Sequence, residues 1–210
     1  MVETTWPMTG FGVAILDFNG DSQLDLFVAN GAVRRVESQL RDGDPHPLRM
    51  ENQLLKGLGG GRFEEVPSNE RQRPVYVEVS RAVAVGDLDN DGDADLVISN
   101  NAGRVRLLLN QQRSAGNWLG LRLIGSQGGG NSYGAQAALV PEDGPLLWRR
   151  VHTDGSFAAA GDPRLILPFG GQAPSMVRVR WPRGPVEDFV DVEPGRYVTL
   201  RQGSGRKVQN

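Results

Sequence analysis

Two short stretches concentrate the oxygen-bearing side chains of this 210-residue chain. Eight of its fifteen aspartates lie in residues 17–25 and 87–95, and both stretches follow the spacing D-x-[DN]-x-D-x-x-x-D. Oxygen ligands at positions 1, 3, 5 and 9 of one tight loop would repel each other unless a cation lay between them. The expected side-chain ligands are Asp17, Asn19, Asp21 and Asp25 in the first loop, and Asp87, Asp89, Asp91 and Asp95 in the second.

The donor atoms of the two loops indicate calcium. Calcium takes six to eight hard oxygen ligands and tolerates irregular geometry, whereas magnesium demands a near-ideal octahedron. Neither loop contains histidine or cysteine, which argues against a transition metal. The remaining ligands would be a backbone carbonyl near position 7, from Gln23 or Asp93, and water. We therefore expect two Ca²⁺ ions.

The second loop matches this pattern better than the first. It has Gly92 at position 6, where the sharp turn requires a residue that accepts positive φ. The first loop has Ser22 at that position, has its glycine two positions earlier at Gly20, and carries three carboxylates instead of four. The alternative interpretation, a solvated acidic turn, is therefore stronger for the first loop.

The elements that position these loops form an internal repeat, in which the pattern of residues 14–30 recurs in residues 84–100. Each copy predicts a short strand, the acidic loop and a second apolar strand, unlike the helix–loop–helix of an EF-hand. Between the copies, residues 52–66 contain the glycine run Gly57-x-Gly59-x-Gly61. No helix follows these glycines, so a dinucleotide-binding loop is not indicated.

The second half of the chain has a different composition. Residues 1–112 contain 17 acidic and 11 basic residues, whereas residues 113–210 contain 8 and 12, with a junction expected at residues 111–116. Short apolar runs separated by glycine and proline turns predict a small antiparallel β-sandwich or barrel. The predicted strands are Trp118–Ile124, Ala135–Val140, Leu146–His152, Leu165–Pro168, Met176–Trp181 and Tyr197–Arg201.

Composition excludes several classes of protein. The net charge of −2 argues against a nucleic-acid binder, and the lack of cysteine excludes disulfide scaffolds and thiolate metal sites. No run of apolar residues is long enough for a membrane span, and no signal peptide is visible at the start of the chain. The abundance of glycine and proline, 28 and 13 in the chain, favours many short strands over a helical bundle.

Both halves resemble known families. The acidic loops and residues 52–66 resemble FG-GAP/VCBS repeats, the calcium-loop repeats that form blades of β-propellers. For residues 52–66 the resemblance implies two strands joined by a hairpin turn at Gly57-x-Gly59-x-Gly61. The second half resembles the ASPIC/UnbV domain, and this order of domains is the layout of the CRTAC1/ASPIC family. The motifs that carry the second resemblance are residues 117–123 (NWLGLRL), 131–135 (NSYGA), 169–170 (FG) and 179–184 (VRWPRG).

The second half departs from the family pattern at two places. Ser132 stands where the family usually has arginine, and Gly170-Gly171-Gln172 stands where Gly-Leu-Gly is expected. If that loop binds a ligand in the family, both differences weigh against such binding here.

The resemblance implies an all-β protein with partial propeller-like blades in residues 1–112 and an ASPIC/UnbV-like domain in residues 113–210. Two repeats are too few for a closed propeller. We therefore expect either a longer parent protein with further blades upstream or a domain that covers the open edge. Weak calcium loops would stay empty in a cytosol, so an extracytoplasmic or secreted setting is expected.

Three functions stay open from the sequence. The first is a non-enzymatic binding or adhesion module with structural calcium and a protein or carbohydrate ligand. The second is a lyase or cyclase of secondary metabolism that uses calcium as a Lewis acid. The third, a carbohydrate-binding module, needs exposed tryptophans on one face. The sequence favours the first, because the two histidines, His46 and His152, lie in turn-like segments and form no catalytic triad.

Overall fold

The computed structural model describes residues 7–67, 76–111, 117–126, 128–170 and 175–208. Its chain is nearly all β, as predicted, and forms two compact units. The first contains residues 1–86, 94–110 and 154–161, and the second contains residues 87–93, 111–153 and 162–210. Most of the expected junction, and Gly171 and Gln172 of the second departure, lie outside the described residues.

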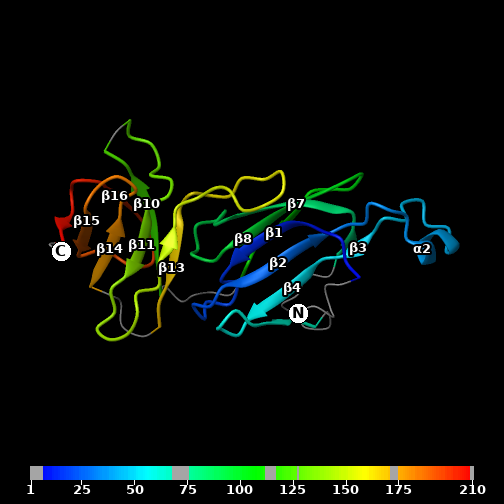
Figure 1. The fold of residues 1–210 in the computed structure, drawn as a ribbon, viewed down its shortest axis with the longest axis horizontal. Helices are drawn as coiled ribbons and strands as arrows, with labels where there is room; N and C mark the ends of the chain where they lie inside the picture. The colour runs from blue at the N-terminus through cyan, green and yellow to red at the C-terminus, as the bar shows by residue number, and fades with distance from the viewer. Residues whose placement is uncertain (1–6, 68–75, 112–116, 127, 171–174, 209–210) are drawn as a thin grey trace. The chain divides into compact units, whose positions relative to one another are not determined.

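The first sheet of the first unit has the antiparallel order β1-β2-β4-β5 (Figure 1). Its strands are β1 (Gly10–Leu16), β2 (Asp25–Asn30), β4 (Gln53–Gly57) and β5 (Phe63–Glu65). The predicted hairpin between β4 and β5 is present: the Leu58 N–H donates to the Arg62 carbonyl, and Gly59, Gly60 and Gly61 all have positive φ. Three such residues in succession require glycine.

The second sheet repeats the start of the first. Its strands, in the antiparallel order β7-β8-β9, are β7 (Ser80–Gly86), β8 (Asp95–Asn100) and β9 (Arg106–Leu108). The β7–β8 pair has the same register as the β1–β2 pair, including an irregularity near the start of the first strand. Side chains from both sheets form one core: Ala14, Leu16, Phe27, Ala29, Leu54, Val66, Val83, Leu96 and Ile98. The two sheets are open, propeller-like blades.

A small insertion separates β2 from β4 in the first sheet. It contains the short helix α2 (Glu37–Arg41), which has no buried side chain, and β3 (Met50–Glu51), which pairs with β6 (Val77–Glu78). The helix therefore contributes nothing to the core.

The second unit is a sandwich of two sheets that share one buried apolar core. One sheet has the order β13-β10-β16, and the other has the order β12-β11-β14-β15-β17. Only β10 and β16 pair in parallel among the described strands of this unit. The strands are β10 (Trp118–Ile124), β11 (Gln136–Leu139), β12 (Arg149–Arg150), β13 (Leu165–Pro168), β14 (Met176–Arg180), β15 (Val186–Val190), β16 (Tyr197–Arg201) and β17 (Arg206–Lys207).

The strands of the sandwich differ from the prediction at three places. The expected strand over residues 146–152 is reduced to β12, and β15 and β17 were not predicted. Strand β15 was missed because it reads as polar: Glu187 is fully buried, where it accepts hydrogen bonds from the indole of Trp181 and the Gly203 N–H. An inward-facing carboxylate breaks the alternation by which strands are recognised.

Candidate metal-binding loops

The two acidic loops have the same backbone conformation. Positions 4 and 6 are left-handed in both, with φ of +72° at Gly20 and +67° at Ser22, and +61° at Asn90 and +93° at Gly92. Each loop therefore has glycine at one of its two left-handed positions and a small polar residue at the other. Asparagine tolerates this conformation better than most residues, whereas serine is strained there. The sequence pattern indicated a single left-handed position, and the structure has two.

The aspartate at position 1 organises each loop. Asp17 accepts hydrogen bonds from the backbone N–H groups of Asp21 (3.1 Å) and Ser22 (2.8 Å). Asp87 accepts the matching bonds from Asp91 (3.1 Å) and Gly92 (3.0 Å). These bonds close the loop around the carboxylate.

The aspartate at position 5 also accepts a hydrogen bond from the loop backbone, one in each loop. Asp21 accepts from the Gln23 N–H at 2.9 Å, and Asp91 accepts from the Asp93 N–H at 3.0 Å. Gln23 and Asp93 occupy position 7, where a backbone carbonyl was the expected ligand. The bonds to their N–H groups hold both residues in the loop.

The aspartate at position 9 begins the strand that follows each loop. Asp25 and Asp95 are fully buried. Asp25 accepts from the Gly57 N–H (2.7 Å) at the end of β4, and Asp95 accepts from the Asn110 N–H (2.8 Å) just beyond β9. Each loop is thus tied to the third strand of its own sheet.

The second loop brings three carboxylates together. Ligand oxygens of Asp87, Asp89 and Asp95 all lie within 4.8 Å of one another, the one such acidic or histidine trio among the residues that the structure describes. Two oxygens on opposite sides of a calcium ion bound at 2.3–2.6 Å are about 5 Å apart, so this spacing fits the ion. Asp87 and Asp95 are buried and Asp89 is exposed, which leaves one side of the group open to water.

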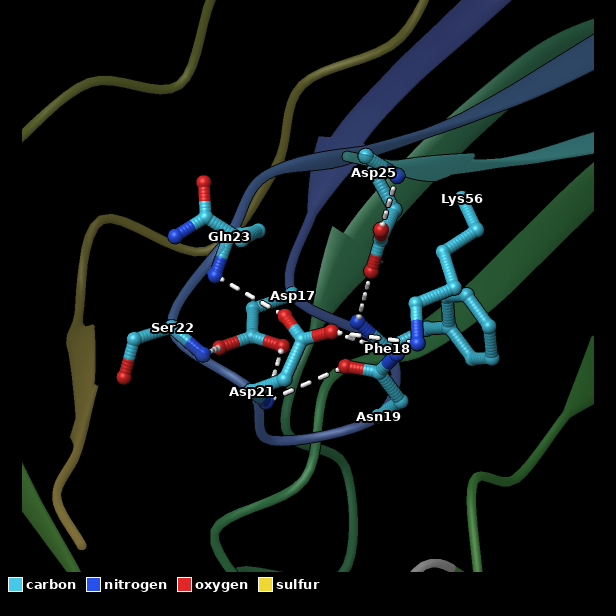
Figure 2. A network of polar contacts seen from close by, with 9 residues as sticks. Asp17, Phe18, Asn19, Asp21, Ser22, Gln23, Asp25 and Lys56 are labelled. Atoms are coloured by element: carbon cyan, nitrogen blue, oxygen red, sulfur yellow. Dashed lines mark hydrogen bonds and ion pairs between the residues drawn. The ribbon is translucent and has the colours of Figure 1, made fainter. Parts of the chain in front are cut away.

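In the first loop, a lysine ammonium and the Asn19 amide contact the carboxylate at position 5. The second loop has a further carboxylate, Asp89, in place of Asn19. The Lys56 ammonium from β4 lies 3.3 Å from Asp21 Oδ2, and the Asn19 side-chain amide donates to the same oxygen at 3.0 Å (Figure 2). Asn19 Oδ1 in turn accepts from the Asp21 N–H. The first loop is therefore partly neutralised by the protein itself and fits a divalent cation less well.

The surroundings of these carboxylates shift their pKa values in different directions. Burial raises the pKa of Asp17 and of Asp25. Burial also raises the pKa of Asp91, assisted by the negative charges of Asp89 and Asp87. At Asp21 burial acts in the same direction, but hydrogen bonds from Gln23, Asn19 and Lys56 outweigh it and lower the pKa. A cation would relieve the desolvation and repulsion that act on the first three groups.

Residues distant in sequence complete the surroundings of the second loop. The Tyr197 hydroxyl donates to Asp87 Oδ2 at 2.7 Å, and burial followed by this bond raises the pKa of Tyr197, which keeps the hydroxyl protonated. Arg164 and Trp118 also contact the loop. Tyr197 is far from Asp87 in the sequence, and no local pattern could have indicated the pairing.

The other candidate residues lie elsewhere. His46 is in an exposed turn where its N–H donates to Asp44, and His152 is exposed. Trp118 and Trp181 are buried, and Trp148 is half-buried beneath Arg180. Ser132, the first departure from the family pattern, donates its N–H to the Leu123 carbonyl.

Two protein families match the chain. The FG-GAP-like repeat matches residues 17–98, which contain both acidic loops, and the ASPIC and UnbV domain matches residues 125–207. The predicted order of the two domains is confirmed. No curated protein matches the sequence. Within the residues that the structure describes, no helix is long and apolar enough to cross a membrane.

Proposed function

From the premise that this chain joins FG-GAP-like repeats to an ASPIC and UnbV domain, we propose that it is a calcium-binding interaction module in which the metal is structural. The observation that carries the proposal is the trio of carboxylates of Asp87, Asp89 and Asp95 within 4.8 Å. A protein or carbohydrate ligand, an extracytoplasmic setting and domain limits at residues 112 and 113 belong to the same proposal.

The residues of the second loop would hold the ion as a group. Asp87, Asp89, Asp91 and Asp95 offer carboxylate oxygens, and Asp93 offers its carbonyl. Bound calcium would neutralise these charges and add its binding free energy to the stability of the fold. Hydrogen bonds from the backbone of the loop hold Asp87 in place, and Asp95 is the first residue of β8. The site therefore links the end of β7 to the start of β8.

The first loop is proposed as a second, weaker calcium site. It has the same backbone and the ligands Asp17, Asn19, Asp21 and Asp25 with the carbonyl of Gln23. Its smaller negative charge and the Lys56 ammonium 3.3 Å from Asp21 both oppose a divalent cation.

A structural metal is favoured over the two alternatives by the arrangement of side chains. Lewis-acid catalysis needs an acid or base aimed at a substrate beside the ion, whereas the Tyr197 hydroxyl at the second loop is already donated to Asp87 at 2.7 Å. A sugar-binding platform needs exposed tryptophans on one face, whereas Trp118 and Trp181 are buried in the described part of the chain.

Calcium titration tests the proposal. The protein is stripped with chelator, and calcium binding is followed by isothermal titration calorimetry and by the midpoint of thermal unfolding. We expect two binding events and a rise in the unfolding midpoint. Asp143→Asn, which removes a charge from an exposed segment, is the matched control and should leave both events unchanged. An absence of heat and of any shift at millimolar calcium would contradict the proposal.

A further inference from the structure

The second acidic loop contacts side chains of the ASPIC and UnbV region, and these contacts lie within one compact unit. Residues 87–93 belong to the second unit, whereas β7 and β8, which flank them, belong to the first. The first loop, in contrast, lies in the first unit together with both of its flanking strands. The second loop therefore belongs to the same compact unit as Trp118, Arg164 and Tyr197, the side chains that contact it.

Tyr197 is the first of these contacts. Its hydroxyl donates to Asp87 Oδ2 at 2.7 Å, the same oxygen that accepts from the Gly92 N–H. The ring is held from two sides, because it packs on Gly120, where a Cβ would lie 2.3 Å from Tyr197 Cδ1, and meets Trp118 edge-on at 5.4 Å. The hydroxyl is thus presented to the loop by a fixed ring.

Arg164 is the second contact, and it donates a hydrogen bond to the loop backbone. Its guanidinium donates to the Asp87 carbonyl at 2.7 Å and to Asn90 Oδ1 at 2.6 Å. The group stacks 4.1 Å above the Tyr197 ring, and Asp162 pairs with its charge. It therefore holds positions 1 and 4 of the loop together, and position 4 is one of the two left-handed residues.

Trp118 is the third contact, and it explains the glycine at position 6. A Cβ on Gly92 would lie 2.1 Å from Trp118 Cδ2, so the indole face lies directly against the loop backbone. Gly92 has φ of +93°, which other residues rarely adopt. Glycine is required here both by the turn and by the indole.

We propose that Tyr197 and Arg164 are positioning residues for the second loop, so that calcium binding there and folding of the second unit stabilise each other. This inference rests on the proposed function, because it assumes that the loop is a calcium site. The side chains touch Asp87 and the loop backbone and are not themselves expected ligands. Groups that orient metal ligands from behind typically change metal affinity about ten- to a hundredfold when removed.

Two substitutions test the positioning role. They are made in a background with Asp17→Asn and Asp21→Asn, so that only the second loop binds. Tyr197→Phe keeps the ring and removes the hydroxyl, and Arg164→Lys keeps the charge and removes the planar fork. We expect each to raise the calcium Kd about tenfold. Tyr133→Phe, at an exposed tyrosine, is the control and should leave Kd unchanged.

Amide hydrogen exchange measured by NMR supplies a reading that does not depend on metal. In calcium-free protein, the Asp91 and Gly92 amides that bond to Asp87 should exchange about tenfold faster in Tyr197→Phe and Arg164→Lys than in the parent. Added calcium should slow exchange in β10 and β16 of the parent, and this effect should shrink in both variants.

The outcomes separate the two proposals. Unchanged Kd and unchanged amide exchange in both variants would overturn the positioning role while leaving calcium binding intact. A parent that binds no calcium would overturn the proposed function and the coupling with it, whatever the amides show. If Tyr197→Phe loses its folded spectrum, Arg164→Lys decides by the same two measurements.

Discussion

The two acidic loops share a backbone and differ in what surrounds it. Both have left-handed residues at positions 4 and 6, both close around the aspartate at position 1, and both tie position 9 to a third strand. The first loop is contacted by a lysine from its own sheet, whereas the second is contacted by Tyr197 and Arg164, which lie far from it in the sequence and in the same compact unit. The repeat fixes the shape of the loop, whereas the number of carboxylates and the neighbouring side chains differ between the two copies.

This difference implies different needs for a cation. In the first loop the Lys56 ammonium and the Asn19 amide already satisfy Asp21. In the second loop Asp91 accepts from the Asp93 N–H but faces the charges of Asp89 and Asp87, and burial together with those charges raises its pKa. We therefore expect the second loop to depend on calcium more strongly than the first.

The largest effect should come from Asp87→Asn. This side chain accepts three hydrogen bonds, from Asp91, Gly92 and Tyr197, and an asparagine amide can replace only part of them. We expect loss of calcium binding at the second loop and a fall of about 2–4 kcal/mol in the free energy of unfolding without calcium. Chemical denaturation in chelator measures the second value.

The same substitution in the first loop is the comparison. Asp17→Asn disturbs two backbone donors and no tyrosine, and Asp17 is only half-buried. Its cost should be about 1–2 kcal/mol. Equal costs for the two variants would show that Tyr197 adds nothing to the second loop.

The next effect concerns the glycines. Gly92→Ala places a Cβ against Trp118 in a left-handed position, and we expect a loss of about 2–4 kcal/mol. Gly20→Ala is also left-handed but meets nothing within 4 Å, so it should cost only about 1 kcal/mol. Thermal unfolding of both variants measures the two losses, and their difference is the cost of the contact between the new Cβ and Trp118. If Gly20→Ala lost as much stability as Gly92→Ala, that contact would contribute nothing.

Much of this structure could be predicted because the signals are local. The recurrence of residues 14–30 in residues 84–100 and the short apolar runs of β10, β13 and β16 place strands directly, since neighbouring residues determine each pattern. Strand β15 was not predicted because Glu187 is buried. The hydrogen-bond donors to Glu187, Trp181 and the Gly203 N–H, come from outside the strand. Local periodicity carries no information about such partners.

The same limit applies to the candidate site. The spacing of the aspartates was sufficient to choose the expected ligands and to rank the loops, but Lys56 and Tyr197 were invisible to it. Lys56 reaches the first loop through the pairing of β4 with β2, whereas Tyr197, on β16, contacts the second loop through tertiary packing. Residues that contact an acidic loop only in the tertiary structure cannot be found from the spacing of its aspartates.

The ranking of the loops can be tested at position 5. Asp91→Ala should weaken calcium binding about tenfold more than Asp21→Ala, because Asp21 is already engaged by Lys56 and Asn19. Calorimetric titration of both variants against the parent measures the difference. Similar losses would contradict the idea that the second loop is the stronger site.

The smallest effect should come from Lys56→Met, and it sharpens the comparison most directly. The substitution removes the ammonium 3.3 Å from Asp21 Oδ2 while keeping an apolar stem of similar length. An exposed ion pair is worth about 0.2–1 kcal/mol, so calcium affinity at the first loop should rise by a factor between about 1.4 and about 5, while the second loop is unaffected. The matched control is Lys207→Met, which removes the chain's other lysine from β17. If Lys56→Met does not change the calcium affinity of the first loop, the Lys56 ammonium has no measurable influence on it. The low affinity of the first loop would then come from Asn19 and the missing carboxylate.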